Sequence, residues 1–153
     1  MRVPGWRSAC PIAFGLDLFG DQWTLLIVRD LFFGKDRTFQ SFLGGPEGIA
    51  SNVLADRLER LVKAGIVLRA ADPADRRRSR FYLTEKGTDL YPVLLEIIRW
   101  SGKYDRQSPA TPAVVKRLAE GQEEMMAGQR SAVRAARRAN QRGGSSRSIK
   151  PVC

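Results

Sequence analysis

Four arginines form the densest group of binding side chains in this 153-residue sequence: Arg76, Arg77, Arg78 and Arg80. Guanidinium groups bind phosphate through paired N–H donors and favour the narrow, electronegative grooves of DNA. Neighbouring arginines also repel one another, and an anionic partner offsets that repulsion. We therefore expect this cluster to bind a phosphate backbone or to probe a minor groove, with a solvated charged loop as the alternative.

A second group of polar residues opens the segment 51–64, where the spacing of apolar residues predicts a helix. The residues expected to be buried are Leu54, Leu58, Leu61 and Val62. If the first half of this helix entered a major groove, Asn52 could pair with adenine, and Ser51 or Arg57 could reach bases or phosphate. Alternatively, Ser51 only caps the helix, and the charged residues pair with one another at a spacing of four. Those pairs would be Asp56 with Arg60 and Glu59 with Lys63.

Cys10 is the residue best suited to act as a chemical switch, because it precedes Pro11 at the expected start of a helix. The helix N-terminus and Arg7, three residues earlier, both favour a thiolate. The alternative is a small, buried and inert thiol that fills space beside the helices through which two copies of the chain would pair. The other cysteine is Cys153, and the sequence has no histidine. We therefore expect neither a disulfide framework nor a zinc cluster, and no cofactor.

The elements that must position these residues follow an order typical of a winged helix-turn-helix. Periodicity and capping residues predict helices over 11–19, 38–43, 51–64 and 85–104, a further helix that Asp21 caps and that ends at Phe33, and strands over 66–70 and 80–83. The arginine cluster lies in the loop between the strands, which is the wing. Pro92 is expected to kink the last of these helices. The fold class is therefore mainly α with a small β-hairpin.

The helix predicted over 85–104 carries more apolar surface than a small winged helix can cover by itself. This stripe consists of Leu90, Val93, Leu94, Ile97, Ile98 and Trp100. Pairing with a second copy would cover this stripe. It would also place the two copies of the helix predicted over 51–64, the reading helices, about one DNA turn apart, roughly 34 Å. An inverted-repeat site follows from that symmetry. The alternative is that the helix folds back on its own domain.

The charge is distributed unevenly along the sequence. The net charge is +10, but residues 1–105 hold 16 Lys and Arg against 13 Asp and Glu, whereas residues 106–153 hold 10 against 3. Most of the excess therefore lies outside the winged module, and the total alone does not establish a DNA-binding core. We divide the chain into a flexible lead-in, a DNA-binding domain with N- and C-terminal dimerisation helices, a basic helical extension and a disordered tail. Their ranges are 1–9, 10–105, 106–142 and 143–153.

Several short motifs occur in an order and spacing that resemble HxlR-type winged helix-turn-helix regulators over roughly residues 8–104. They are Cys10-Pro11, Gln22-Trp23-Thr24-Leu25-Leu26-Ile27, Arg29-Asp30-Leu31, Gly48-Ile49, Val53-Leu54 and Leu83-Thr84-Glu85-Lys86-Gly87. The resemblance implies a dimeric bacterial transcription regulator, and some members of the family use a cysteine at the place of Cys10 as a redox or electrophile sensor. The chain departs from the family pattern at Gln22, Ala50-Ser51-Asn52, Asp56 and Arg80, so an operator preference cannot be carried over.

These observations favour a sequence-specific regulator that binds double-stranded DNA as a homodimer on an inverted repeat and responds to a small-molecule or oxidant effector. The alternative is a general nucleic-acid-binding protein driven by the basic extension. An enzyme is disfavoured and no catalytic residue is expected, because histidine is absent and no glycine-rich phosphate loop occurs. No apolar run approaches the ~20 residues that cross a bilayer, so we expect a cytoplasmic protein without a membrane partner.

Overall fold

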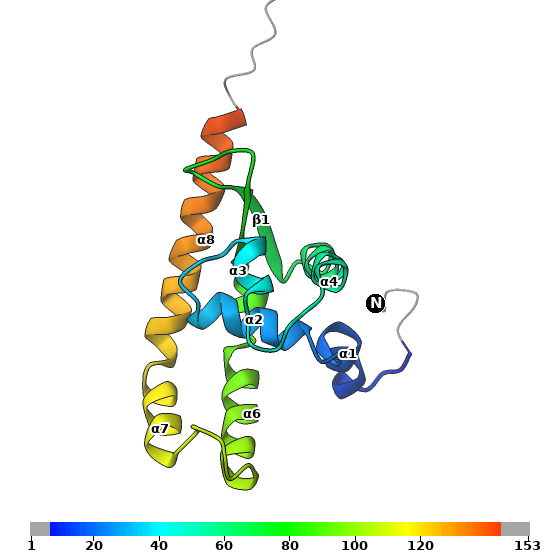
Figure 1. The fold of residues 1–153 in the computed structure, drawn as a ribbon, viewed down its shortest axis with the longest axis vertical. Helices are drawn as coiled ribbons and strands as arrows, with labels where there is room; N and C mark the ends of the chain where they lie inside the picture. Colours follow the sequence, from blue (N-terminus) through cyan, green and yellow to red (C-terminus); the bar gives the residue numbers. More distant parts are fainter. Residues whose placement is uncertain (1–6, 145–153) are drawn as a thin grey trace, which may run out of the picture.

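The computed structural model describes residues 7–144, which form eight helices and one antiparallel hairpin (Figure 1). In chain order the elements are α1 (Pro11–Phe19), α2 (Thr24–Phe33), α3 (Phe39–Leu43), α4 (Ser51–Lys63), β1 (Val67–Ala71), β2 (Ser79–Leu83), α5 (Glu85–Thr88), α6 (Tyr91–Tyr104), α7 (Pro112–Glu120) and α8 (Gln122–Gly144). This arrangement confirms the predicted fold class, a winged helix-turn-helix followed by a helical extension.

Local hydrogen bonds explain where several elements begin and end. The Thr38 side chain accepts from the backbone N–H of Ser41, which caps α3, and the Thr84 side chain caps α5 by accepting from the N–H of Gly87. Gly65 follows α4 at φ 71°, a conformation that glycine adopts without a Cβ penalty. There Ile66 N–H bonds the Leu61 carbonyl and Gly65 N–H bonds the Val62 carbonyl, so the chain turns sharply into β1.

The main core lies between α2, α4, the hairpin and α6. Val28, Leu31, Leu54 and Leu83 are completely buried in it. Val62 was expected there too, but this prediction is wrong: 37% of its surface is exposed. It follows Leu61 by one residue, which rotates its side chain about 100° around the helix axis, out of the core and toward the hairpin.

The helix predicted over 85–104 is two helices rather than one kinked helix. α5 ends at Thr88, and α6 starts at Tyr91 with Pro92 in its first turn, where the missing N–H leaves no hydrogen bond broken. Gly87 lies against the backbone just before β1, because a Cβ on it would stand 2.1 Å from the carbonyl oxygen of Ile66. The close approach explains why glycine ends the Leu-Thr-Glu-Lys-Gly motif.

The C-terminal helices pack on the winged module. α8 runs alongside the hairpin, and α7 lies beside α6 (Figure 1). Val133 and Ala136 of α8 are buried against Ala70 and Tyr82, while Met126 joins the main core. α8 extends two residues into the segment expected to be disordered, and the remainder of that segment, Cys153 included, lies outside the described residues. Between residues 7 and 144, no helix is apolar over a length sufficient to cross a membrane.

Candidate nucleic-acid interface

The first turn of α4 is exposed and carries no cap. Ala50 occupies the N-cap position, so Ser51 is the first helical residue and does not cap the helix. Ser51 and Asn52 are both exposed, and the turn contains no acidic residue. Backbone N–H groups at a helix start that lack a side-chain acceptor attract anions, phosphate above all. The start of α4 thus offers N–H donors and two short polar side chains to a common partner.

Arg57 lies deeper than the sequence predicted. Its Nε is 3.1 Å from Asp21 Oδ1 and its Nη1 is 2.5 Å from Asp56 Oδ2, and 22% of its side chain is exposed. It therefore ties α4 to the turn that precedes α2 instead of facing outward with Asn52. The expected Asp56–Arg60 pair is not formed, whereas Glu59 and Lys63 do pair at 2.9 Å on the exposed face.

Asp21 anchors this turn through several donors. Burial alone would raise the pKa of its carboxyl group. Hydrogen bonds from the Thr24 side chain, from the backbone N–H groups of Trp23 and Thr24 and from Arg57 outweigh burial and lower the pKa. The sequence predicted Asp21 as the cap of this helix, and the bonds from the Trp23 and Thr24 N–H groups supply that cap, although the regular part of α2 begins only at Thr24.

The wing presents three of its four arginines to solvent. Arg76, Arg77 and Arg78 are exposed, and 91% of the Arg77 side chain is accessible although its Nε lies 3.2 Å from Asp75. Arg80 differs, because its Nε is 2.9 Å from Oδ2 of the buried Asp72. The ion pair therefore stabilises the wing on its inner side, and fewer donors of Arg80 remain for a phosphate.

Asp72 organises the loop that carries these arginines. Its Oδ1 accepts from Ala74 N–H at 2.9 Å, and its own N–H donates to the Arg78 carbonyl at 2.9 Å. The N–H of Ala74, followed by Arg80, lowers the pKa of the Asp72 carboxyl group. The carboxylate form is thus the one that holds the wing.

A groove of about 540 Å³ separates α4 from the hairpin. Ala55, Glu59 and Val62 line it on the helix side, and Arg69, Arg77 and Ser79 line it on the hairpin side. Sequence reasoning missed Arg69, which is the exposed residue of β1 and donates to Ser79 Oγ at 2.9 Å. The signal that could have found it is its outward place in the strand alternation. The groove brings the helix and two cations of the hairpin to one surface.

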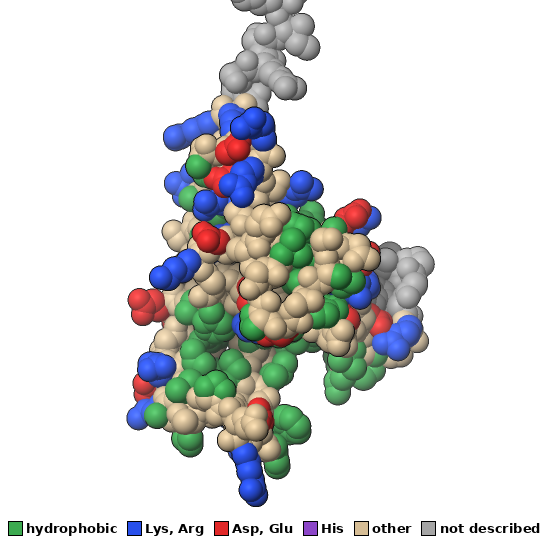
Figure 2. Space-filling model, viewed as in Figure 1, with side chains coloured by type: hydrophobic (Ala, Val, Ile, Leu, Met, Phe, Trp, Pro, Cys, Tyr) green, Lys and Arg blue, Asp and Glu red, His purple; other side chains and the backbone are tan. Residues whose placement is uncertain are grey.

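The basic face of α8 continues the cationic surface of the wing. Its exposed arginines are Arg134, Arg137, Arg138 and Arg142. The guanidinium of Arg76 reaches the end of α8, since a Cβ on Gly143 would stand 2.1 Å from it. Figure 2 shows Lys and Arg side chains gathered where the hairpin tip meets this helix end. We call these four arginines, together with Arg76, Arg77 and Arg78, the upper basic surface.

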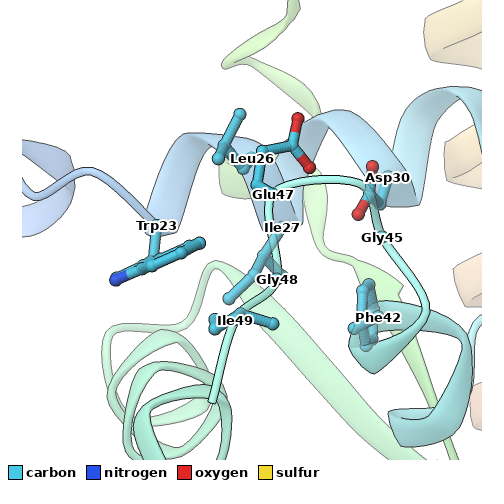
Figure 3. Close-up of a pocket in the computed structure, with 9 residues that line it drawn as sticks. All are labelled: Trp23, Leu26, Ile27, Asp30, Phe42, Gly45, Glu47, Gly48 and Ile49. Carbon is cyan, nitrogen blue, oxygen red and sulfur yellow. The ribbon is translucent and has the colours of Figure 1, made fainter.

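The loop before α4 closes over a small cavity, shown in Figure 3. Its volume of about 20 Å³ suits a single water molecule and no larger ligand. Arg29 bonds both carboxylate oxygens of Glu47, at 2.5 and 3.0 Å, and thereby lowers the pKa of Glu47. Gly48 turns the loop at φ 69°. The loop, held by the bonds between Arg29 and Glu47, therefore fixes the entry of the chain into α4. The cavity beneath it is too small to be an effector site.

The expected dimerisation stripe is divided between the core and the surface. Leu94 is buried in the core, and Leu90, Val93 and Ile98 are partly buried. Ile97 is 45% exposed, Trp100 65% and Tyr104 69%. On α1, large apolar side chains are exposed as well: Ile12, Phe14 and Leu16. Although α6 packs on the core and on α7, it still presents an uncovered apolar face.

Cys10 is exposed at the N-cap position of α1 in this single chain. The buried thiol that we considered as the alternative is therefore not what the isolated chain shows. The Arg7 guanidinium is paired with Asp17 and not with the thiol, because its Nε donates to Asp17 Oδ1 at 2.6 Å. The thiol is thus an exposed group at the start of α1 without the cationic neighbour that the sequence predicted.

A short helix pair followed by an exposed reading helix and a basic hairpin defines a winged helix-turn-helix protein. Residues 18–109 match the model of the HxlR-like helix-turn-helix family, which confirms the resemblance seen in the sequence. The chain belongs to this family.

Individual relatives agree with this assignment. The HTH-type transcriptional regulator Rv3095 of Mycobacterium tuberculosis is 38% identical over 89 residues, which are 58% of this chain and 55% of the relative. The chain thus matches little more than half the length of that protein. Among solved structures, PA1607, described as a candidate transcription factor, is 36% identical with a TM-score of 0.61, over 67% of this chain and 70% of PA1607. Reduced YodB, a transcriptional regulator of Bacillus subtilis, is 30% identical with a TM-score of 0.53, over 65% of this chain and 97% of YodB.

Proposed function

We propose that this chain is a homodimeric regulator of transcription that recognises an inverted repeat in double-stranded DNA. The observation that carries the proposal is an uncapped, exposed α4 N-terminus on a module whose wing exposes Arg76, Arg77 and Arg78. The groove between the later turns of α4 and the hairpin, lined by Arg69 and Arg77, adds cations beside the same helix. Ser51 and Asn52 would read base edges, while Arg77 and Arg78 would hold phosphates. Arg57 and Arg80 would stabilise this surface through their ion pairs rather than contact DNA directly.

The dimer would form through the uncovered faces of α1 and α6. Ile97 and Trp100 of α6 and Ile12 of α1 expose apolar area that water penalises, and a two-fold partner supplies matching area. In this arrangement Leu94 supports the interface from the core side, and Leu90, Val93 and Ile98 contribute their exposed edges. Two-fold symmetry then presents two α4 helices to successive major grooves.

A thiol response is part of the proposal, because Cys10 is exposed at the start of a helix beside the proposed dimer face. Structures of the relative YodB exist in a reduced and in a quinone-bound form. We infer that oxidation or alkylation of Cys10 changes DNA binding. The test compares DNA affinity before and after treatment with a quinone, for the native chain and for Cys10→Ser. An equal response of both proteins would exclude Cys10 as the sensor.

General nucleic-acid binding is the second candidate, and the upper basic surface is the observation that favours it. Removing the extension is not a clean test, because Met126 and Val133 belong to the packed interior. Charge removal by Arg134→Gln, Arg137→Gln and Arg138→Gln leaves that packing in place. If general binding dominates, these changes abolish affinity for every duplex alike. If the winged module dominates, they weaken all duplexes moderately and preserve the ranking of sequences.

The deciding experiment is selection of bound fragments from genomic DNA by the full chain, with and without a thiol oxidant. The proposal predicts an enriched inverted repeat with half-site centres about 10 base pairs apart. It also predicts a different recovery under oxidant, lost in Cys10→Ser. A pool without a shared sequence would overturn the proposal in favour of general binding.

A further inference from the structure

A second, larger cavity, widely open to solvent, lies where the C-terminal extension meets the winged module. Its volume is about 540 Å³, within the range of small-molecule sites. Arg37, from the loop between α2 and α3, borders it on one side, Tyr91 of α6 on another, and Met125 and Gln129 of α8 on a third. Because residues 117–129 supply much of its wall, the cavity exists only when α7 and α8 pack on the module.

Arg37 is the unusual residue of this cavity. It is partly buried, and no Asp or Glu in residues 7–144 lies within ion-pair distance of it, whereas every other partly buried arginine there has a carboxylate partner. Its Nη1 donates to Gln129 Oε1 at 2.9 Å, and its guanidinium lies 5.4 Å from the ring centre of Tyr82. Burial lowers the pKa of Arg37, and the nearby Arg80 lowers it further, while Tyr82 acts in the opposite direction.

This charge lacks the compensation that buried charges ordinarily have. A guanidinium has five N–H donors, and one of those of Arg37 has a side-chain acceptor within the described residues. Burying a cation without an anion is costly, and the arrangement persists in proteins when a partner restores the balance. An anion seated in the cavity would accept from two of the remaining donors and supply the missing negative charge.

The rest of the wall is largely apolar. Tyr91 is 2% exposed: its hydroxyl donates to the Leu118 carbonyl at 2.9 Å and its ring packs on Phe32, so it closes the wall and presents only a ring edge. Met125 and Leu118 add flexible apolar surface, and a Cβ on Gly128 would meet nothing within 4 Å. Arg117 and Glu124 also line the cavity, are exposed and carry opposite charges, so the net charge of the lining is that of Arg37.

We propose that this cavity binds a small organic monocarboxylate with an apolar body. The carboxylate would accept from the guanidinium of Arg37 and from the side-chain amide N–H of Gln129, and the apolar body would lie against Tyr91 and Met125. Guanidinium and carboxylate form paired, charge-assisted hydrogen bonds, which are stronger than neutral ones. The ligand thus supplies the anion that Arg37 lacks.

The same segment is joined to the wing. The carbonyl of Arg37 accepts from Phe81 N–H at 2.8 Å, and Thr38 forms a β-bridge with Arg80. A ligand bound to Arg37 would therefore act on a segment that is hydrogen-bonded to β2, the strand that follows the arginine loop. If the proposed DNA-binding function holds, ligand and DNA affinities must influence each other reciprocally, because the two binding events are thermodynamically linked.

Calorimetric titration of the full chain with hexanoate, 3-phenylpropionate and indole-3-acetate, each against its neutral amide, tests the site without DNA. We expect at least one acid to bind saturably and its amide to bind at least tenfold more weakly. Arg37→Gln removes the charge, and Gly128→Leu fills the open space while improving helix propensity. Each should weaken the acid at least tenfold, whereas Arg99→Gln on α6 should leave it unchanged.

Failure of all three acids to bind, or equal binding of acid and amide, would overturn the inference. Retention of full affinity by a folded Gly128→Leu would do the same, and this variant remains informative if Arg37→Gln does not fold. These outcomes are independent of the DNA-binding proposal, which fails instead if the unliganded chain selects no sequence. A change in DNA affinity with a saturating acid, lost in Gly128→Leu, would establish the coupling to the wing.

Discussion

Replacing Arg77 and Arg78 by glutamine should remove most of the phosphate grip of the wing without disturbing its fold. The Arg77 side chain is 91% exposed, and no ion pair of the Arg78 side chain is present within the described residues. The backbone bonds that shape the loop, from Asp72 N–H to the Arg78 carbonyl and from Arg78 N–H to Asp75, do not involve either guanidinium. The change therefore removes one exposed ion pair, Arg77 with Asp75, and leaves the backbone bonds of the loop in place.

The magnitude follows from counterion release. Each phosphate neutralised by a cation contributes about 0.9 to the slope of log K against log salt concentration. Two arginines in each of two protomers amount to four contacts, so the double variant should lower the slope by up to ~3.6. Affinity at low salt should fall together with the slope, and it should fall for all sequences nearly alike.

The assay is fluorescence anisotropy with one duplex at several salt concentrations. The matched control is Arg106→Gln with Lys116→Gln, which removes the same charge from exposed positions near and on α7, away from the wing. If both double variants lower the slope equally, net charge alone drives binding. In that case the placement of the wing arginines is irrelevant and the reasoning is refuted.

Three further predictions concern assembly and stability. Trp100→Glu should convert the proposed dimer into a monomer in light scattering, because it places a charge on the uncovered face of α6, and a persistent dimer would exclude this face. Gly87→Ala should lower the free energy of unfolding by ~1–3 kcal/mol in denaturant titrations, because its Cβ collides with the Ile66 carbonyl, and an unchanged midpoint would contradict the packing. The pKa of Asp21 is lowered from 3.8, so its contribution is present above about pH 4 and is lost as the pH falls through the lower, folded value. Asp21→Asn should reduce that acid dependence of unfolding, and an identical pH profile would show that Asp21 does not anchor α2.

The local signals in the sequence were sufficient for the fold. Thr38 and Thr84 cap through the residue three positions later, and Gly65 ends α4 by its positive φ, so each boundary is encoded within a few residues. The kink predicted at Pro92 was wrong. This proline marks the start of a new helix, and a proline in a first turn looks in sequence much like a proline in a kink.

The site was less predictable, because its charges pair with partners that no helical or strand spacing indicates. Arg57 meets Asp21 across 36 positions, and Arg80 pairs with a buried Asp72 whose depth no local pattern reveals. Both arginines read as free cations in the sequence, where the spacing of residues says nothing about such partners. The cavity beside Arg37 was invisible for the same reason, since it requires α8 to pack against the module.

The most direct test of the central proposal is the affinity of the full chain for a selected duplex and for a shuffled duplex of the same composition, at about 150 mM salt. A sequence-reading dimer should bind the selected duplex at least ~10³-fold more tightly, with two protomers per site. Equal affinity for both duplexes would contradict recognition by α4 and leave only attraction to the phosphate backbone.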